Sequence, residues 1–251
     1  MIPKRIYQIW LKRNPDVIVP QLTQEFIGNV KQWCSTNGYE YILIDNDSEV
    51  FRECAEKSSF FQYWMKRTDN KKYVAALSDY IRLYVLYKYG GIYLDTDVRI
   101  IEGFNDFLDN RFFLCVEPLY HDHQELFRRF DIGTIGSEPG NKYISIMLEY
   151  LDTAFTQAYF SNRNISKEST VSRLKSGKPI YRLWVALPDL WPFVLQELMH
   201  MDIEVITENR KLKSEDERLE VYTDTFFSRD GEYVKHCYHT MWRKDLDGFK
   251  Q

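Results

Sequence analysis

The stretch of sequence that decides the fold is YGGIYLDTDV, residues 89–98. Its apolar run predicts a buried strand over Ile92–Asp95, and the two glycines before it would end a helix, because glycine readily adopts the left-handed conformation of a helix C-cap. Successive side chains of a strand point to opposite faces, so Asp95 and Asp97 are expected to share one face. Two carboxylates held this close repel each other unless a positive charge lies between them. The stretch therefore predicts a strand end that faces a positively charged group.

Strands and helices alternate along the first half of the chain and become less regular in the second half. In the first half, hydrophobic periodicity predicts strands over 5–11, 39–44 and 92–95 and helices over 21–34, 49–57, 60–66 and 72–89. In the second half it predicts strands over 112–116, 132–135, 203–206 and 220–222, helices over 141–158 and 191–201, and a polar loop over 160–178. The alternation predicts an α/β fold with a single, mostly parallel central sheet flanked by helices.

Composition restricts the class of protein. The 251 residues are enough to bury a large core, and no linker divides the sequence, so one domain is expected. The net charge of −4 argues against nucleic acid as a partner, because binding to a phosphate backbone requires a basic face. The four cysteines form no C-x-x-C pair, which is typical of reduced thiols in the cytosol. The sequence has neither an apolar signal core nor a run of about 18 apolar residues, so we expect a cytoplasmic protein without a spanning helix.

The helix predicted over 72–89 contains one pair of opposite charges. Asp79 and Arg82 lie three residues apart, so they are neighbours on one face of the helix. A surface ion pair worth about 0.2–0.5 kcal/mol is one interpretation. The residues around the pair are almost all apolar, however, and a buried pair costs several kcal/mol per ion unless further partners satisfy it. The pattern therefore favours a buried site that binds a polar ligand.

Three interpretations of Asp95 and Asp97 follow from the residues alone. The first is a turn with two solvated carboxylates, which occurs in many proteins. The second is the aspartate pair of a phosphoryl-transfer enzyme of the haloacid-dehalogenase kind, but that chemistry expects Thr or Val where Arg99 stands. The third is a divalent cation held by the carboxylates and completed by a diphosphate, which suits hard Mg²⁺ or Mn²⁺. Such a cation would neutralise the carboxylates and screen the diphosphate as it leaves.

The longer segment AALSDYIRLYVLYKYGGIYLDTDV, residues 75–98, resembles the sugar-binding D-x-D signature of glycosyltransferase family 32. That family includes polysaccharide and mannan-chain transferases and is related to the glucosyltransferase domain of large bacterial cytotoxins. Further segments that resemble family segments are IPKRIYQIW at 2–10, IGSEPGNKYI at 135–144 and YVKHCYHTMW at 233–242. The sequence departs from the family pattern at Tyr7 (usually His), Leu187 (usually Gly) and Met241 (usually Ser).

The resemblance implies a GT-A fold over 1–251, with a nucleotide-sugar-binding half at about 1–104 and an acceptor half with a C-terminal closing segment at about 105–251. It implies a nucleotide-diphosphate-sugar donor, with a UDP-sugar as the leading candidate, and Mn²⁺ or Mg²⁺ as the cofactor. It also implies hexosyl transfer with retention at the anomeric carbon. Because no residue stands out as a nucleophile, we expect departure and attack on the same face, driven by positioning and electrostatic stabilisation of the leaving group.

The same resemblance assigns roles to four residues in and before the signature. Asp79 and Arg82 would bind the donor sugar or its phosphates. Asp95 would contact ribose or sugar hydroxyls and share the metal through water, and Asp97 would ligate the metal directly. These four residues form the expected catalytic group, and the first three also belong to the expected donor site.

Residues near the two ends of the chain would complete this site. Trp10 would stack on the base of the donor, and Trp242 would close over it. His236, six residues before that tryptophan, would approach the metal or the diphosphate, with His239 as the alternative histidine. The resemblance thus implies that His236 joins the two signature aspartates as a metal ligand.

The leading hypothesis is an enzyme that adds a sugar to a growing surface glycan, such as a bacterial capsule or O-antigen. The acceptor would be a glycan, with a lipid-linked oligosaccharide as a candidate, which would bring a cytoplasmic protein to the inner membrane surface. Two alternatives remain: a metal-dependent sugar-phosphate phosphatase or hydrolase, and a nucleotide-sugar-binding module that has lost transfer. Release of nucleotide diphosphate from a donor distinguishes the enzyme from the binding module, and release of inorganic phosphate indicates the phosphatase.

Overall fold

The structure is a computed structural model that describes residues 1–69, 73–116, 130–155, 219–222 and 233–236. In chain order its elements are β1 (Arg5–Ile9), α1 (Gln21–Asn37), β2 (Glu40–Ile44), α2 (Glu49–Lys57), α3 (Ser59–Met65), α4 (Tyr73–Tyr89), β3 (Gly91–Leu94), β4 (Val98–Ile100), η1 (Asn105–Phe107), β5 (Phe112–Val116), β6 (Phe130–Ser137), α5 (Lys142–Tyr150), the π-helical turn η2 (Leu151–Phe155), β7 (Leu219–Tyr222) and β8 (Val234–His236).

A six-stranded sheet forms the centre of the fold, in the order β2-β1-β3-β6-β5-β7. β1 pairs in parallel with both β2 and β3, and β5 pairs in parallel with β7. Only β6 runs against its neighbours, so five of the six described strands share one direction. The expected α/β fold with a mostly parallel central sheet is therefore confirmed. β4 and β8 form a separate two-stranded antiparallel sheet that the sequence did not predict.

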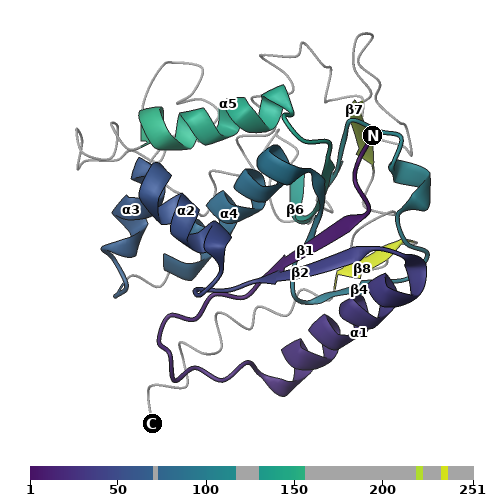
Figure 1. The fold of residues 1–251 in the computed structure, drawn as a ribbon, viewed down its shortest axis with the longest axis horizontal. Helices are drawn as coiled ribbons and strands as arrows, with labels where there is room; N and C mark the ends of the chain where they lie inside the picture. The colour runs from purple at the N-terminus through teal and green to yellow at the C-terminus, as the bar shows by residue number, and fades with distance from the viewer. Residues whose placement is uncertain (70–72, 117–129, 156–218, 223–232, 237–251) are drawn as a thin grey trace, which may run out of the picture.

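Helices cover both faces of the sheet, as Figure 1 shows: α2, α3, α4 and α5 lie on one side and α1 on the other. Tyr7 and Ile9 of β1 point into the core on the α4 side, and Ile6 points into the core on the α1 side. On α1, Phe26, Val30 and Cys34 recur every four residues and are buried, which is the pattern of a helix with one apolar face. Alternation along the strands thus divides the core into two layers.

The two glycines between α4 and β3 allow the helix to end against the sheet. Gly90 has φ 66° and donates its N–H to the carbonyl of Leu86 at 3.0 Å, and a Cβ there would lie 2.6 Å from Pro139. Gly91 has φ 119°, and a Cβ there would lie 2.7 Å from the carbonyl of Arg5. Both positions need the left-handed region and close backbone approach, so only glycine fits without strain. The expected helix end is confirmed.

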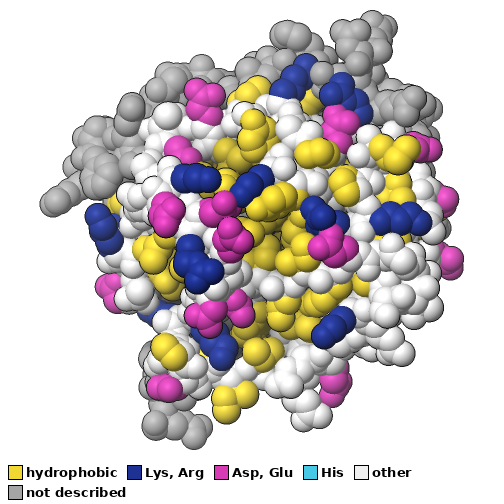
Figure 2. All heavy atoms as spheres, in the orientation of Figure 1, with side chains coloured by type: hydrophobic (Ala, Val, Ile, Leu, Met, Phe, Trp, Pro, Cys, Tyr) yellow, Lys and Arg dark blue, Asp and Glu magenta, His cyan; other side chains and the backbone are white. Residues whose placement is uncertain are grey.

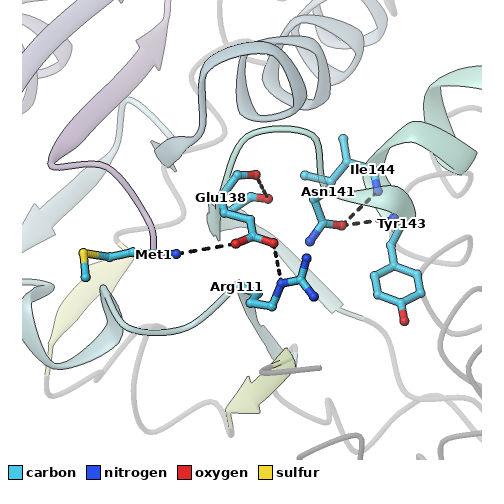
Figure 3. Close-up of polar contacts among 7 residues, drawn as sticks. Met1, Arg111, Glu138, Asn141, Tyr143 and Ile144 are labelled. Carbon is cyan, nitrogen blue, oxygen red and sulfur yellow. Dashed lines mark hydrogen bonds and ion pairs between the residues drawn. The ribbon is translucent and has the colours of Figure 1, made fainter. Parts of the chain in front are cut away.

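Polar contacts fix the end of the sheet that lies away from the D-x-D turn, where Ser137 of β6 pairs with Gly91, the first residue of β3. Figure 3 shows Glu138 beside Arg111 and shows Asn141 capping α5. The Asn141 side chain accepts hydrogen bonds from the main-chain N–H groups of Tyr143 (3.0 Å) and Ile144 (3.4 Å). These contacts satisfy orphan donors of the first helical turn.

Several predicted elements differ from the structure at their ends. The first strand stops at Ile9 rather than Leu11, and the helix expected over 141–158 is α-helical only to Tyr150 before it widens into η2. The loop expected over 160–178, the helix over 191–201 and the strand over 203–206 lie outside the described residues.

The surface mixes charge types. On the face shown in Figure 2, acidic and basic side chains alternate around a central group of apolar side chains. Among the residues that the structure describes, no helix combines the length and apolar character that a membrane crossing would require.

Candidate active site

The candidate site lies at the carboxyl edge of the parallel strands. β1 and β3 pair in parallel, with Ile6 opposite Ile92 and Tyr7 opposite Tyr93. Trp10 directly follows β1, and the D-x-D residues directly follow β3, so both sequence segments lie at the same edge of the sheet. Ligands bind at this edge in open α/β sheets, because loops there can converge on them.

The D-x-D residues form a connection between two strands rather than a strand end. β3 stops at Leu94, Thr96 and Asp97 form a turn, and β4 begins at Val98. Strand alternation therefore does not extend to Asp95 and Asp97, as the sequence analysis assumed it would, because the strand stops before both aspartates. We call residues 95–97 the D-x-D turn, and all three are partly exposed.

Main-chain contacts hold Asp95 at the start of this turn. Its N–H donates to the carbonyl of Gly133 in β6 at 2.8 Å. Its carbonyl accepts a hydrogen bond from Nε2 of Gln8 in β1 at 3.0 Å. The first residue of the turn is thus tied to the strands on both sides of β3.

Arg82 of α4 lies between two carboxylates. Its Nη2 is 2.9 Å from Oδ1 of Asp79 and 3.7 Å from Oδ1 of Asp95. Its Nη1 donates to the carbonyl of Ile132 at 2.6 Å, and the guanidinium lies 4.4 Å from the ring centre of Tyr93. Arg82 is 6% exposed and Asp79 is 9% exposed, so a surface ion pair is ruled out. The predicted burial of this pair is confirmed, and Arg82 is a positive charge beside the D-x-D turn.

Burial changes the acidity of the groups around Arg82. Desolvation raises the pKa of Asp79 to about 6, the Arg82 charge opposes this rise, and the Asp95 charge adds to it. Desolvation also raises the pKa of Tyr93 well above its ordinary value. Tyr93 therefore keeps its proton at neutral pH, and its hydroxyl donates to Oδ1 of Asp95 at 2.6 Å. A charge-assisted hydrogen bond of this kind fixes the carboxylate orientation.

Trp10 is the first residue of the loop that follows β1. Its main-chain N–H donates to the carbonyl of Ile44 at 2.9 Å, and its Nε1 is buried with no hydrogen-bond partner among the described residues. Next to it, the Lys12 N–H donates to Oδ1 of Asn46 at 2.7 Å, which joins the loops after β1 and β2. Trp10 thus lies on a structured loop at the edge of the sheet that carries the D-x-D turn.

The second half of the chain returns to the D-x-D turn through β8. This strand pairs antiparallel with β4, with His236 opposite Val98 and Val234 opposite Ile100. The main chain of His236 is thus directly beside the residue that follows Asp97. The side chain of His236 and the whole of His239 and Trp242 lie outside the described part of the chain.

The carboxylates of the D-x-D turn suit a cation that the protein and a bound ligand coordinate together better than a metal site built from protein side chains alone. Carboxylate oxygens suit hard divalent ions. Within the described residues, however, no group of three or more His, Cys, Asp or Glu side chains could hold a metal. Asp95 and Asp97 would therefore supply only part of the coordination shell of such an ion.

Sequence analysis missed two contributors to this site, Gln8 and Tyr93. Gln8 could have been noticed, because it is a lone amide in an apolar strand next to the centre of the sheet, where polar side chains need partners. Tyr93 lies two residues before Asp95, but this spacing is too common to identify a partner.

A cavity of about 550 Å³ lies elsewhere, lined by Glu102, Gly103, Asn105, Asp106 and Tyr233. These residues follow β4 or precede β8, whereas the D-x-D turn precedes β4. The cavity is therefore at the opposite end of β4 from Asp97.

The part of the chain that carries the D-x-D turn is similar in sequence to known glycosyltransferases. Residues 4–114 match the family model described as glycosyltransferase sugar-binding region containing a DXD motif. The chain is 34% identical over 205 residues to inositol phosphoceramide mannosyltransferase 3 of Schizosaccharomyces pombe, covering 76% of this chain and 51% of the relative. It is 29% identical over 141 residues to an uncharacterized glycosyltransferase of Acanthamoeba polyphaga mimivirus, and this match covers 56% of this chain and 52% of the relative. The chain thus spans about half the length of the curated relatives it matches.

Two solved structures share a more distant likeness. One is the PaToxG glycosyltransferase, with a TM-score of 0.45 and 19% identity over 78% of this chain and 70% of that one. The other is a glycosyltransferase involved in glycosylation of the major capsid of PBCV-1, with a TM-score of 0.41 and 9% identity over 96% of this chain and 98% of that one. Residues 4–114 thus form a glycosyltransferase sugar-binding region with a D-x-D motif, and the predicted resemblance to glycosyltransferase family 32 is confirmed.

Proposed function

We propose that the chain is a metal-dependent, retaining glycosyltransferase with a GT-A fold, which transfers a hexose from a nucleotide-diphosphate sugar to a glycan acceptor. The observation that carries this proposal is the position of Arg82, buried between Asp79 and Asp95 beside the D-x-D turn. Buried charges are costly unless they are paired and hydrogen-bonded, and Asp95 is the most exposed of these three side chains. Such an arrangement suits binding better than stability.

The charges of this set favour the sugar over the phosphates as its ligand. At neutral pH two carboxylates surround one guanidinium, so the three side chains carry a net negative charge. Arg82 is already engaged by Asp79 and by the carbonyl of Ile132. Carboxylate oxygens accept hydrogen bonds from hydroxyl groups, whereas a diphosphate would be repelled by them. Asp79, Arg82 and Asp95 would therefore bind donor hydroxyls and orient the sugar ring.

We assign the remaining roles as the resemblance to the family implies them. Trp10 would stack on the base, and a UDP-sugar is the first donor to test. Mn²⁺ or Mg²⁺, when bound, would neutralise the leaving diphosphate. Asp95 and Asp97 would hold that cation, with His236 of the neighbouring β8 as a third ligand and Trp242 closing the site. Catalysis would then come from positioning and from electrostatic stabilisation, with departure and attack on the same face.

The acceptor we propose is a lipid-linked glycan in surface polysaccharide synthesis, reached from the cytoplasmic side of the membrane. The name of the Schizosaccharomyces pombe relative, an inositol phosphoceramide mannosyltransferase, supports a lipid-borne acceptor and a hexose donor. Within the chain, we assign donor binding to about 1–104 and acceptor binding to about 105–251.

A donor panel tests the proposal. The protein is incubated with UDP-, GDP- and other nucleotide sugars in Mn²⁺, and release of nucleotide diphosphate is measured with and without a chelator. We expect slow release from one donor, lost in the chelator and in the Asp97→Asn variant. Release of inorganic phosphate from sugar phosphates would instead support the phosphatase. Tight donor binding without any release, with or without added acceptor glycans, would support the binding module.

A further inference from the structure

Gln8 connects three adjacent strands through its side chain. It is fully buried in β1, with an exposed fraction of 0%. Its Oε1 accepts a hydrogen bond from the hydroxyl of Tyr41 in β2 at 3.0 Å, and its Nε2 donates to the carbonyl of Asp95, after β3, at 3.0 Å. We call this chain of two hydrogen bonds, from Tyr41 through Gln8 to Asp95, the Gln8 brace.

The chemistry of the brace allows one orientation only. The Asp95 carbonyl accepts but cannot donate, so the amide NH₂ of Gln8 must face it. The amide oxygen must then face Tyr41, whose hydroxyl can donate. Burial raises the pKa of Tyr41, so this hydroxyl keeps its proton at neutral pH. A turned amide would place its oxygen against the Asp95 carbonyl, and the bond to that carbonyl would be lost.

The brace reaches Asp95 from the face opposite to Arg82. Along β1, Tyr7 and Ile9 point to the α4 side, so Gln8, between them, points to the α1 side. The carboxylate of Asp95 instead contacts Tyr93 and Arg82 on the α4 side. Asp95 is therefore fixed twice, through its carboxylate from one face and through its carbonyl from the other.

We infer that Gln8 is a positioning residue for the D-x-D turn, and that Tyr41 supports Gln8 through a hydrogen bond to its amide oxygen. This rests on the proposed function in one respect, that the turn binds the donor with its cation. The Asp95 carbonyl is the last main-chain group before Thr96 and Asp97, so its position sets where the Asp97 carboxylate lies. Loss of the brace leaves the Asp95 carboxylate contacts intact but frees the turn to move.

Three variants test the inference. Gln8→Met keeps an unbranched side chain of similar length and removes both hydrogen bonds. Tyr41→Phe removes only the hydroxyl that donates to the amide oxygen. Asn141→Ala is the matched control, because it removes two hydrogen bonds of a buried amide at the opposite end of the sheet (Figure 3).

Two measurements separate positioning from general destabilisation. In the free protein, amide hydrogen exchange at residues 95–98 is measured well below the melting temperature of each variant. We expect at least tenfold faster exchange there in Gln8→Met, a smaller increase in Tyr41→Phe, and no change in Asn141→Ala. Binding of Mn²⁺ in the presence of UDP, followed by electron paramagnetic resonance, should weaken about tenfold in Gln8→Met and stay unchanged in Asn141→Ala.

Equal exchange at 95–98 in Gln8→Met and Asn141→Ala would overturn the inference. If Gln8→Met does not fold, the Tyr41→Phe variant tests the inference instead, because Tyr41 is only half-buried and keeps its ring in that variant. Unchanged amide exchange at residues 95–98 in Tyr41→Phe would also overturn the inference. A wild-type protein that binds no Mn²⁺ with UDP and releases no nucleotide diphosphate contradicts the proposed function. The exchange measurement on the free protein still decides the role of Gln8 in that case.

Discussion

Replacement of Asp79 by asparagine should remove a large pH dependence from the stability of the protein. Burial raises the pKa of this carboxyl from 3.8 to about 6 in the folded protein, against the opposing effect of Arg82. The folded state therefore binds the Asp79 proton more tightly than the unfolded chain does. The stabilisation from this proton is fully present below about pH 4 and is lost as the pH rises through about 6.

The size of the effect follows from the same two values. Each tenfold difference in proton affinity corresponds to about 1.4 kcal/mol, so a pKa raised from 3.8 to about 6 corresponds to about 3 kcal/mol. Asparagine does not titrate in this range. The unfolding free energy of Asp79→Asn minus that of the wild type should therefore rise by up to about 3 kcal/mol between pH 4 and pH 7.

Urea unfolding of both proteins at half-unit steps from pH 4 to pH 7 measures this difference, and titration of distant groups cancels in it. Asn141→Ala serves as the control, because loss of a helix cap costs about 1 kcal/mol without a titrating group, so its difference from the wild type should be constant. A constant difference for Asp79→Asn would show that Arg82 fully compensates the burial. A difference that falls with rising pH would show that the ion pair outweighs desolvation, and either result refutes the reasoning.

Three further predictions concern the site itself. Asp97→Asn should leave the melting temperature within a few degrees of the wild type. It should weaken Mn²⁺ binding in the presence of UDP, measured by paramagnetic resonance, by more than about tenfold. Mn²⁺ affinity equal to that of the wild type would exclude Asp97 as a metal ligand. Arg82→Ala should lower the unfolding free energy by about 3 kcal/mol or more, because it leaves Asp79 buried without its partner, and Arg82→Lys should recover part of that loss in the same urea assay. Addition of UDP and Mn²⁺ should slow amide exchange beyond β8, over residues 237–243, if the end of the chain closes over the donor; unchanged exchange there would assign this segment to packing alone.

The parts of the fold that the sequence predicts correctly are those with local causes. α4 has a continuous apolar pattern that ends at two glycines, and the observed helix ends at Tyr89. The buried pair of Asp79 and Arg82 follows from helical spacing in apolar surroundings, because no neighbouring residue offers a solvated face. Prediction succeeds here because the information lies within one or two turns of helix.

The D-x-D turn was predicted less well for a related reason. The apolar run before Asp95 correctly predicts a strand, but periodicity contains no signal for where hydrogen bonding to the neighbouring strand stops. β3 is only four residues long, and the turn begins as soon as its pairing with β6 ends at Leu94 and Thr134. Extending side-chain alternation to Asp97 thus goes three residues beyond the strand on which it depends.

Contacts between segments distant in sequence could not be predicted from either segment alone. β4 and β8 have three residues each, too few for hydrophobic alternation to distinguish a strand from a loop. In this pairing Val98 lies opposite His236, and the main-chain carbonyl of Tyr233 accepts a hydrogen bond from the N–H of Ile101 at 2.8 Å. Among the described strands, each has only the other as its hydrogen-bonded neighbour. Since β4 begins directly after Asp97, this pairing holds the end of the D-x-D turn opposite to the one that Gln8 contacts.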